Sequence, residues 1–446
     1  MTSAAVDRAR QATVTTFAGT AIVIADMVGV GVFTSLGFQV KDVTSNFAIL
    51  FLWFVGGVVA LCGAFCYAEL SAMFPRSSGE YNFLTRAYNP GTGFLAGWLS
   101  ATVGFSAPVA LAAMAFGDYF RSIVPSAPPL ISGLAAIWLI SSFHLIGIRQ
   151  GSALQIASTL LKFALIVAFI IAGFATGGGQ SVSFMPKAGD SALIFSAPFA
   201  MSLVFVMYAY SGWNAATYIV SEIKDPQRSL PKALFLGTGT VIVLYLALNA
   251  VFLYTTPVAE LAGQLNVAQV VGTHVFNQSG GRIVGALICL GLISTISAMM
   301  WIGPRVTMTM GEDLPMLRLF ARRSANGVPA VAISFQVVVA SLLLWTGSFE
   351  AVLDFIQFSL TFCSFLTVLG MVKLRFTRPD FPRPYRAWGY PFTPIVFLGA
   401  TSLIMYYLIT ARPLQSFAGF LMMCAGLLLY GLGSLQQAGA RRAPAE

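Results

Sequence analysis

In this chain of 446 residues, 57% of the residues are hydrophobic and only 9% are charged, whereas about a quarter of the residues in soluble domains are charged. The composition therefore excludes an ordinary soluble protein and indicates an integral membrane protein. The formal net charge of +9 arises from Lys and Arg residues that gather in loops on one face. This distribution indicates the orientation of the chain in a membrane and does not favour nucleic-acid binding.

Long apolar runs recur along the whole chain, and about 20 such residues in a helix cross a hydrocarbon layer of about 30 Å. The first run is full length and no small-residue cleavage site follows it, so we expect it to be retained as a span. The expected fold is an all-α membrane protein with an N-terminal segment (1–13) and a C-terminal tail (436–446) that is disordered. Twelve helices are predicted, at residues 14–36, 46–72, 94–122, 130–147, 151–173, 196–223, 233–254, 282–311, 329–346, 350–374, 391–410 and 414–435.

The Lys and Arg residues are unevenly divided between the two predicted faces of the membrane. Nineteen of the 25 fall on the face that carries both termini, and five fall on the other face. This bias predicts that both termini lie in the cytoplasm of a multi-pass protein of the cell's inner (plasma) membrane. The five cysteines lie within predicted spans without a CxxC motif, so we expect no metal, no cofactor and no structural disulfide.

The first predicted span contains two glycines and an aspartate at mid-depth, in the stretch VIADMVGVGVF (residues 23–33). Gly29 and Gly31 are weak helix formers, and an unwound backbone in hydrocarbon is tolerated only where it is buried in protein or lines a watery cavity. The stretch therefore predicts a broken helix beside a cavity. Small residues also let membrane helices pack closely, which is the alternative explanation for the two glycines.

A second interruption is predicted in the sixth span, in MYAYSGWNAATY (residues 207–218), where Ser211, Gly212 and Asn214 gather at mid-depth. Paired interruptions in two halves of a chain are typical of transporters built from inverted repeats, which bind their substrate near the middle of the membrane. The expected units are a first repeat (14–173), a second repeat (196–374) and two peripheral helices (391–435).

Broken helices expose main-chain groups with opposite partial charges. Freed N–H groups at the start of a half-helix attract a carboxylate, and freed carbonyl groups at the end of a half-helix attract an ammonium or a metal cation. Both kinds of end together match an α-amino acid.

Five stretches of the chain carry a family resemblance. They are GVGVF (29–33), CYAELSAMFPRSSGEYNFL (66–84), GIRQGSALQIASTLLK (147–162), YAYSGWNAATYIVSEIKDPQRSLPKAL (208–234) and LRFTRPDFPRPYRAWGYP (374–391). In this order they resemble the amino acid-polyamine-organocation superfamily, in particular bacterial amino acid permeases related to the L-type amino acid transporters. The resemblance implies a leucine-transporter-type fold with a 5+5 inverted repeat, broken helices 1 and 6, and amino acid transport by alternating access.

The resemblance also implies roles for single residues. The backbone of helix 1 would hold the substrate carboxylate, the backbone of helix 6 would hold its ammonium, and Tyr208 or Trp213 would close over the substrate. Ser106 on helix 3 would line the far wall. The implied substrate-binding residues are Val28, Gly29, Val30, Gly31, Val32, Ser106, Tyr208, Ala209, Tyr210, Ser211 and Trp213.

The chain departs from the family pattern in three places. Many relatives have a serine where this chain has Val30, so a hydroxyl contact to the carboxylate is missing. The segment PRVTMTMGEDLP (304–315) is slightly shorter than the family pattern. Eukaryotic L-type transporters join a heavy subunit through a cysteine after helix 3, and the loop RSIVPSAPP (121–129) has none, so we expect no disulfide-linked partner.

Lys162 lies in the middle of the fifth predicted span, where a charged lysine costs several kcal/mol and needs a partner or a cavity. In proton-coupled members of the resembled family, a lysine here takes the place of a sodium ion beside helix 1. This implies a coupling role for Lys162 and independence from sodium. A permanently charged lysine that braces helix 1 against helix 5 is an equally open interpretation.

Asp26 lies about one helical turn before Gly29, so we expect it near the break and assign it, with Lys162, to coupling. Three interpretations stay open. Asp26 pairs with Lys162, or it meets a cationic substrate side chain, or it stays neutral and donates a hydrogen bond to unwound backbone.

The cytoplasmic face carries charged residues that could form an inner gate of ion pairs or remain a solvated surface. They are Glu69, Arg76, Glu80, Glu222, Lys224 and Arg228.

Motifs of membrane enzymes, such as HExxH, are missing from the sequence, so we expect no enzyme. The polar groups converge at two breaks, whereas a channel needs a continuous polar path. We predict a secondary transporter of neutral α-amino acids that works by proton symport or by exchange, and whose partners are the amino acid, protons and membrane lipid. The alternatives are a transporter of cationic amino acids or amines and, in a different class, a transporter-like amino acid sensor.

Overall fold

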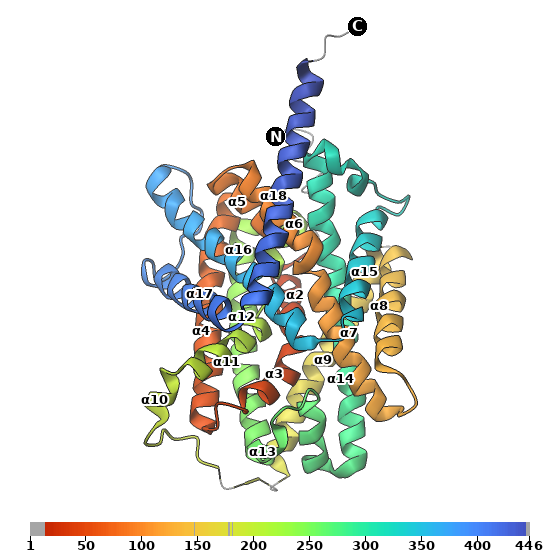
Figure 1. The fold of residues 1–446 in the computed structure, drawn as a ribbon, viewed down its shortest axis with the longest axis vertical. Helices are drawn as coiled ribbons and strands as arrows, with labels where there is room; N and C mark the ends of the chain where they lie inside the picture. Colours follow the sequence, from red (N-terminus) through yellow and green to blue (C-terminus); the bar gives the residue numbers. More distant parts are fainter. Residues whose placement is uncertain (1–13, 147, 177–178, 181, 443–446) are drawn as a thin grey trace.

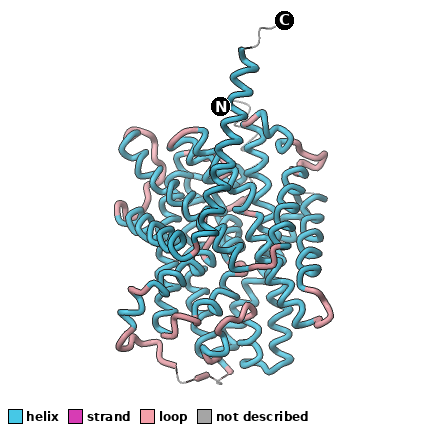
Figure 2. The backbone as a smooth tube through the Cα atoms, viewed as in Figure 1, coloured by secondary structure: helices cyan, strands magenta, loops and turns pink. Residues whose placement is uncertain are grey.

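The computed structural model describes residues 14–146, 148–176, 179–180 and 182–442, without the side chains of residues 148–158 and 436–442. The predicted N-terminal segment 1–13 lies outside the described residues. Throughout the described part the chain is helical and forms no β-strand, as Figure 2 shows. One isolated bridge pairs Val14 with Ile223.

Nine helical segments of the described part are long and apolar enough to cross a membrane, which makes the chain a multi-pass membrane protein. They are α2 (Thr16–Met27) with α3 (Gly31–Gln39), α4 (Asn46–Met73), α6 (Pro90–Leu99) with η1 (Ser100–Gly104) and α7 (Ser106–Ile123), α8 (Pro129–Ile146), α12 (Pro226–Thr255), α14 (Val267–Asp313), α16 (Phe349–Thr377), α17 (Phe392–Ala411) and α18 (Pro413–Arg442).

The remaining three predicted spans coincide with α9 (Ile148–Ala175), α11 (Ala197–Ala209) and α15 (Ala330–Trp345), whose described apolar stretches are shorter. Short connecting elements complete the chain. They are α5 (Gly79–Ala87), α10 (Asp190–Ile194), η2 (Ala215–Glu222), α13 (Val258–Leu261) and η3 (Pro315–Ala321).

Two boundaries differ from the sequence prediction. α14 begins at Val267, upstream of the predicted eighth span, and it is interrupted at Asn277, where φ is 68°. α18 continues to Arg442, so residues 436–442 of the predicted disordered tail are helical, while residues 443–446 lie outside the described residues. Gln, Ala and Arg favour helix and extend α18 beyond its apolar stretch.

The helices form one bundle (Figure 1). α18 projects from one end of the bundle, called the α18 end below, and α10 and α13 lie at the opposite end. α2 packs closely on α12 because the contact is made by small residues. An added methyl group at Gly19 would lie 3.2 Å from Ala233 Cβ, and one at Gly237 would lie 2.6 Å from a methyl carbon of Val23.

Candidate functional site

The first predicted span is broken at the expected place. α2 ends at Met27 and α3 begins at Gly31, and residues 28–30 between them are not helical. Val28 has φ −75° and ψ 80°, outside the helical region. The predicted carboxylate-binding stretch from Val28 to Val32 is buried throughout. The first N–H groups of α3 therefore begin a helix inside the protein, where they have no acceptor within their own helix.

The sixth predicted span is also broken. α11 ends at Ala209, residues 210–214 form a turn, and η2 continues from Ala215 as a 3-10 helix. Gly212 has a φ of +93°, a left-handed conformation that favours glycine. Ala209, Tyr210 and Ser211, three of the predicted ammonium-binding residues, lie at the end of α11 and in this turn.

The two breaks touch each other. An added methyl group at Gly31 would lie 2.6 Å from Ala209 Cα and 3.2 Å from Ala209 N. Only glycine lets the start of α3 approach the end of α11 this closely. Gly31 is thus explained both by the helix break and by the close packing of two helix ends.

Tyr245 of α12 bridges the two breaks. Its buried hydroxyl lies 2.6 Å from the carbonyl oxygen of Met27 and 3.0 Å from that of Ala209, and its single proton is shared between these acceptors at the ends of α2 and α11. Sequence analysis did not single out this residue. The available signal was a hydroxyl in the middle of the otherwise apolar seventh predicted span.

Lys162 of α9 reaches the same break from another side. Its Nζ donates to the carbonyl of Ala25 at 2.9 Å, to the carbonyl of Val28, and to Thr295 Oγ1 of α14 at 3.4 Å. The ammonium thus lies at the C-terminal end of α2, where the helix dipole is negative. This placement joins helices 1, 5 and 8 of the predicted order, in agreement with the bracing interpretation.

Asp26 lies on the last turn of α2, and only 4% of its surface is exposed. No ion pair within 4.0 Å joins Asp26 to Lys162 among the described residues, although the two groups interact electrostatically over a longer distance. The pairing interpretation therefore stays a prediction. The predicted hydrogen bond to unwound backbone is also missing among the described residues, and Oδ1 has no partner there. The carboxylate instead packs against the second break. An added methyl group at Gly212 would lie 2.8 Å from Asp26 Oδ2.

The predicted aromatic side chains do not all face the breaks. Trp213 packs edge-on against Tyr67 of α4, with ring centroids 4.6 Å apart, and against Phe397 of α17 at 5.9 Å. The ring of Trp213 is thus held against α4 and α17, and its closure over a substrate stays a prediction. Tyr208 is buried at the end of α11 and remains the other candidate for closure.

Tyr210 also points away from the first break. Its ring contacts Trp53 at a centroid distance of 6.0 Å and Tyr245 at 5.0 Å, and its hydroxyl has no partner among the described residues. Only the backbone of Tyr210 therefore belongs to the candidate site.

The third predicted span changes its winding beside Ser106. Residues Ser100–Gly104 form a π-helix, and α7 starts at Ser106. Pro108 has no N–H to donate to the carbonyl of Gly104, which disfavours regular α-helix here, and π-helical turns often occur at functional sites. Ser106 is fully buried and its Oγ has no partner in the described part of the chain, so it keeps free hydrogen-bonding capacity. Its role as a wall residue stays a prediction.

Three aromatic rings join α3, α11 and α16 next to the two breaks. Phe38 of α3 stacks on Phe205 of α11 at 5.1 Å and on Phe349 of α16 at 6.2 Å between ring centroids. Sequence analysis did not identify this stack, because its members come from three distant segments.

Polar contacts close the α18 end. Val14 N donates to the carbonyl of Glu222 at 2.9 Å, which ties the start of the first span to the end of η2. Arg76 pairs with Asp313 at 2.7 Å, and Glu222 pairs with Arg305 at 2.8 Å. The hydrogen bond to Asp313 raises the pKa of the Arg76 guanidinium, against the lowering effect of burial.

A polar cavity of about 510 Å³ lies at these ion pairs, and Trp301 forms part of its wall. Between this cavity and the breaks, Ile22, Ile219 and Trp301 leave a space of only about 10 Å³. Apolar side chains therefore nearly fill this part of the molecule.

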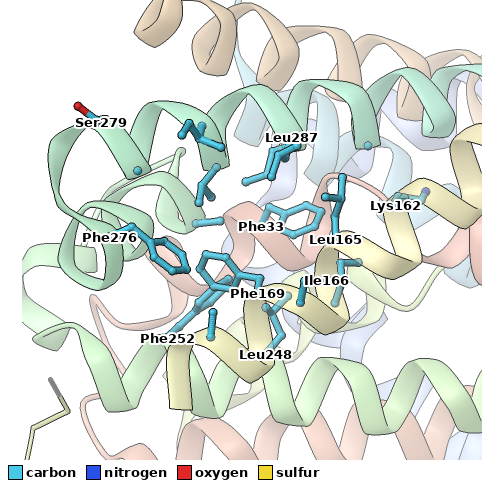
Figure 3. A pocket seen from close by; sticks show the side chains of 18 of the residues that line it. Phe33, Lys162, Leu165, Ile166, Phe169, Leu248, Phe252, Phe276, Ser279 and Leu287 are labelled. Carbon is cyan, nitrogen blue, oxygen red and sulfur yellow. The ribbon is translucent and has the colours of Figure 1, made fainter. Parts of the chain in front are cut away.

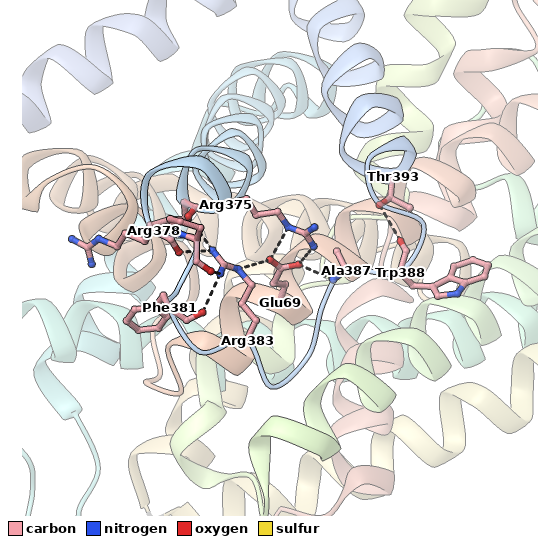
Figure 4. A network of polar contacts seen from close by, with 10 residues as sticks. Glu69, Arg375, Arg378, Phe381, Arg383, Ala387, Trp388 and Thr393 are labelled. Carbon is pink, nitrogen blue, oxygen red and sulfur yellow. Dashed lines mark hydrogen bonds and ion pairs between the residues drawn. The ribbon is translucent and has the colours of Figure 1, made fainter.

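Other residues of the expected inner gate have different partners. Glu69 is fully buried and binds Arg375, Arg383 at 3.4 Å and the backbone N–H of Ala387 at 2.7 Å, as Figure 4 shows. These contacts join α4 to the last turn of α16 and to the segment that follows it. Arg228 makes only an exposed pair with Asp225 at 4.0 Å.

Glu80 of α5 accepts hydrogen bonds from Tyr67 and, at 3.0 Å, from Ser364. Burial raises the pKa of the Glu80 carboxyl to about 7, against the lowering effect of these two hydrogen bonds. Glu80 is thus a buried titratable group behind the gate.

An apolar cavity of about 530 Å³ lies beside the first break, between α9, α12 and α14 (Figure 3). Phe33, Phe169, Phe252 and Phe276 line it, and Lys162 stands at one edge. Its lining offers few polar groups, so the cavity does not fit a zwitterion. Among the described residues, no cluster of three or more His, Cys, Asp or Glu side chains could hold a metal ion.

Comparisons with known proteins agree with this arrangement. A family model described as amino acid permease matches residues 14–432. The b(0,+)-type amino acid transporter 1 of Homo sapiens is 26% identical over 421 residues, which cover 93% of this chain and 85% of the relative. The Asc-type amino acid transporter 1 of Mus musculus is 23% identical over 92% of this chain and 79% of the relative. The serine/threonine exchanger SteT of Bacillus subtilis is 23% identical over 92% of this chain and 94% of the relative.

Proposed function

The chain belongs to the amino acid permease family, and from this premise we propose that it moves α-amino acids, neutral ones among them, across the cell membrane by alternating access. The observation that carries the proposal is the contact between two broken helices, where Gly31 at the start of α3 lies against Ala209 at the end of α11. A zwitterion needs an anion site and a cation site a few bonds apart, and this contact places a helix start beside a helix end.

The substrate carboxylate binds at the start of α3. The N–H groups of Gly31 and Val32 lack acceptors within their own helix and lie at its positive end. Val30 contributes no hydroxyl, so recognition of the carboxylate is a main-chain function. The substrate ammonium binds at the end of α11, where the carbonyl of Ala209 keeps one lone pair beside its bond to Tyr245.

The remaining parts of the site have supporting roles. Ser106 faces the substrate from α7 and Tyr208 covers it. Lys162 takes the place that a metal cation would occupy at the end of α2, so transport needs no sodium. The carbonyls of Ala25 and Val28 that Lys162 binds are the acceptors such a cation would use.

The twelve predicted spans cross the membrane, and spans 1–5 and 6–10 form the two inverted repeats. Both termini face the cytoplasm, which agrees with the gathering of Lys and Arg at the α18 end. The polar cavity between Arg76 and Arg305 is then the cytoplasmic vestibule.

Exchange is the favoured mode of transport over proton symport. One relative carries exchange of amino acids in its name, and the site holds a lysine whose ammonium is fully engaged with acceptors. The loop between α7 and α8 has no cysteine, so no subunit is attached there through a disulfide.

Counterflow in proteoliposomes tests this function. Vesicles containing the purified protein are loaded with each of the twenty amino acids and placed in labelled alanine, without sodium, with and without a pH gradient. We expect accumulation of label in vesicles loaded with accepted amino acids, independent of the gradient. Saturable binding without accumulation from any loaded amino acid would favour a sensor and refute transport.

A further inference from the structure

Asp26 occupies the junction of the two breaks, and among the described residues it makes no hydrogen bond and no ion pair within 4.0 Å. It belongs to the last turn of α2, and its Oδ2 lies against the backbone of Gly212 in the turn after α11. Gly212 has a left-handed conformation and no side chain, so the carboxylate of Asp26 directly faces the backbone of the turn. Asp26 is therefore an acidic group directed at the second break.

The ammonium of Lys162 interacts electrostatically with Asp26 from a distance, but the hydrogen bonds of the charged and phenolic groups around α2 go to other acceptors. The ammonium of Lys162 is distributed over two carbonyls and Thr295, and the hydroxyl of Tyr245 binds the carbonyls of Met27 and Ala209. Asp26 makes no ion pair among the described residues, and its Oδ1 is buried without a hydrogen-bond donor.

A buried carboxylate without a partner is costly, and acidic residues at membrane depth commonly mark the route of a substrate or an ion. A zwitterion does not need this carboxylate, because its two charged ends are matched by the main-chain groups of the two breaks. An acidic group beyond that pair of sites matches a substrate that carries one further positive charge.

We propose that Asp26 is a specificity-determining residue that supplies the counter-charge for a cationic substrate side chain, so that the protein accepts α-amino acids bearing an ammonium or guanidinium group. This inference rests on the proposed function and adds a substrate class to it. The substrate backbone binds at Gly31 and Ala209, and its side chain extends along the turn toward Asp26. The same site takes neutral amino acids, whose side chains leave Asp26 uncontacted.

The test compares lysine with norleucine, which has the same hydrocarbon chain without the ammonium. Competition against labelled alanine counterflow is measured for both compounds with wild type, Asp26→Asn and Asp26→Glu. We expect wild type to prefer lysine over norleucine, Asp26→Asn to reduce this preference by about tenfold or more, and Asp26→Glu to retain it. Competition by norleucine and competition by alanine should each be the same in all three proteins.

Three outcomes would overturn the inference. They are a wild type that does not prefer lysine, an Asp26→Asn variant with an unchanged preference, and an Asp26→Asn variant that loses only its pH dependence, which would make Asp26 a proton carrier. In each of these cases alanine counterflow persists, so the proposed function stands. Absence of alanine counterflow in wild type refutes both. If Asp26→Asn fails to fold, Asp26→Glu and wild type are still compared, and a wild type without a preference for lysine or an Asp26→Glu variant that loses it overturns the inference.

Discussion

Gly31 and Ala209 lie so close together that a methyl group on Gly31 would come 2.6 Å from the Cα of Ala209. This contact joins the start of α3 to the end of α11, two segments that are far apart in the chain. Because the opposing atom belongs to the backbone, it cannot move aside as the tip of a flexible side chain would. The positions of the anion site and the cation site relative to each other depend on this approach.

The variant Gly31→Ala is expected to separate the two breaks. Overpacking of this kind costs about 1–3 kcal/mol, and we expect alanine counterflow to fall by about tenfold or more. Gly239→Ala on α12 is the matched control, because an added methyl group there meets nothing within 4 Å. Equal counterflow by the two variants would show that the close approach is not needed.

Tyr245→Phe removes the hydroxyl that bridges the two breaks. We expect this variant to lose about 1–3 kcal/mol of stability, because the carbonyls of Met27 and Ala209 are left without their buried donor. The loss is measured as a lower melting temperature together with slower counterflow. Tyr210→Phe is the control, since that buried hydroxyl has no partner among the described residues. A larger effect at Tyr210 than at Tyr245 would contradict the bridging role.

Lys162→Met tests the brace at the end of α2. Without the ammonium, the carbonyls of Ala25 and Val28 lose their donor, so we expect counterflow to be lost at every pH between 5 and 8 without a shift of the optimum. Lys232→Met, at an exposed position, should behave as wild type. A variant of Lys162 that keeps exchange but loses the response to a pH gradient would instead show that Lys162 titrates.

Glu80 makes stability depend on pH. Its folded pKa of about 7 lies above the ordinary value of 4.5, so the folded state keeps the proton after the unfolded chain has released it. Stability from this group is complete below pH 4.5 and declines as the pH rises to about 7, by about 3 kcal/mol in total. Glu80→Gln should flatten the melting temperature over this range, and the exposed Glu312→Gln should not. A wild-type melting temperature that rises between pH 4.5 and 7 while Glu80→Gln stays parallel to it would refute this assignment.

Both broken helices could be predicted from the sequence, because glycine and small polar residues stand out within apolar runs. Gly29, Gly31 and Gly212 weaken the helix locally, and the breaks occur at those positions. The need of Lys162 for a partner could be predicted because a charge in the middle of a span is costly, whereas its place beside helix 1 was implied by the family resemblance.

Side-chain directions could not be predicted in the same way. Trp213 turns toward α4 and α17, and the tip of Tyr245 reaches two carbonyls, because packing between distant helices decides these orientations. One interpretation paired the Asp26 carboxylate with Lys162, whereas Lys162 donates its hydrogen bonds to main-chain carbonyls of the same helix end and the carboxylate lies against Gly212.

Protection of a single cysteine tests most directly whether an amino acid binds between the two breaks. In a background without the five native cysteines, Val30→Cys is labelled with a small thiol reagent in the presence and absence of alanine, and Met185→Cys in an exposed loop serves as the reference. We predict that alanine slows labelling at residue 30 in a saturable manner and leaves residue 185 unaffected. Equal labelling of residue 30 with and without alanine, in protein that performs counterflow, would contradict the central claim.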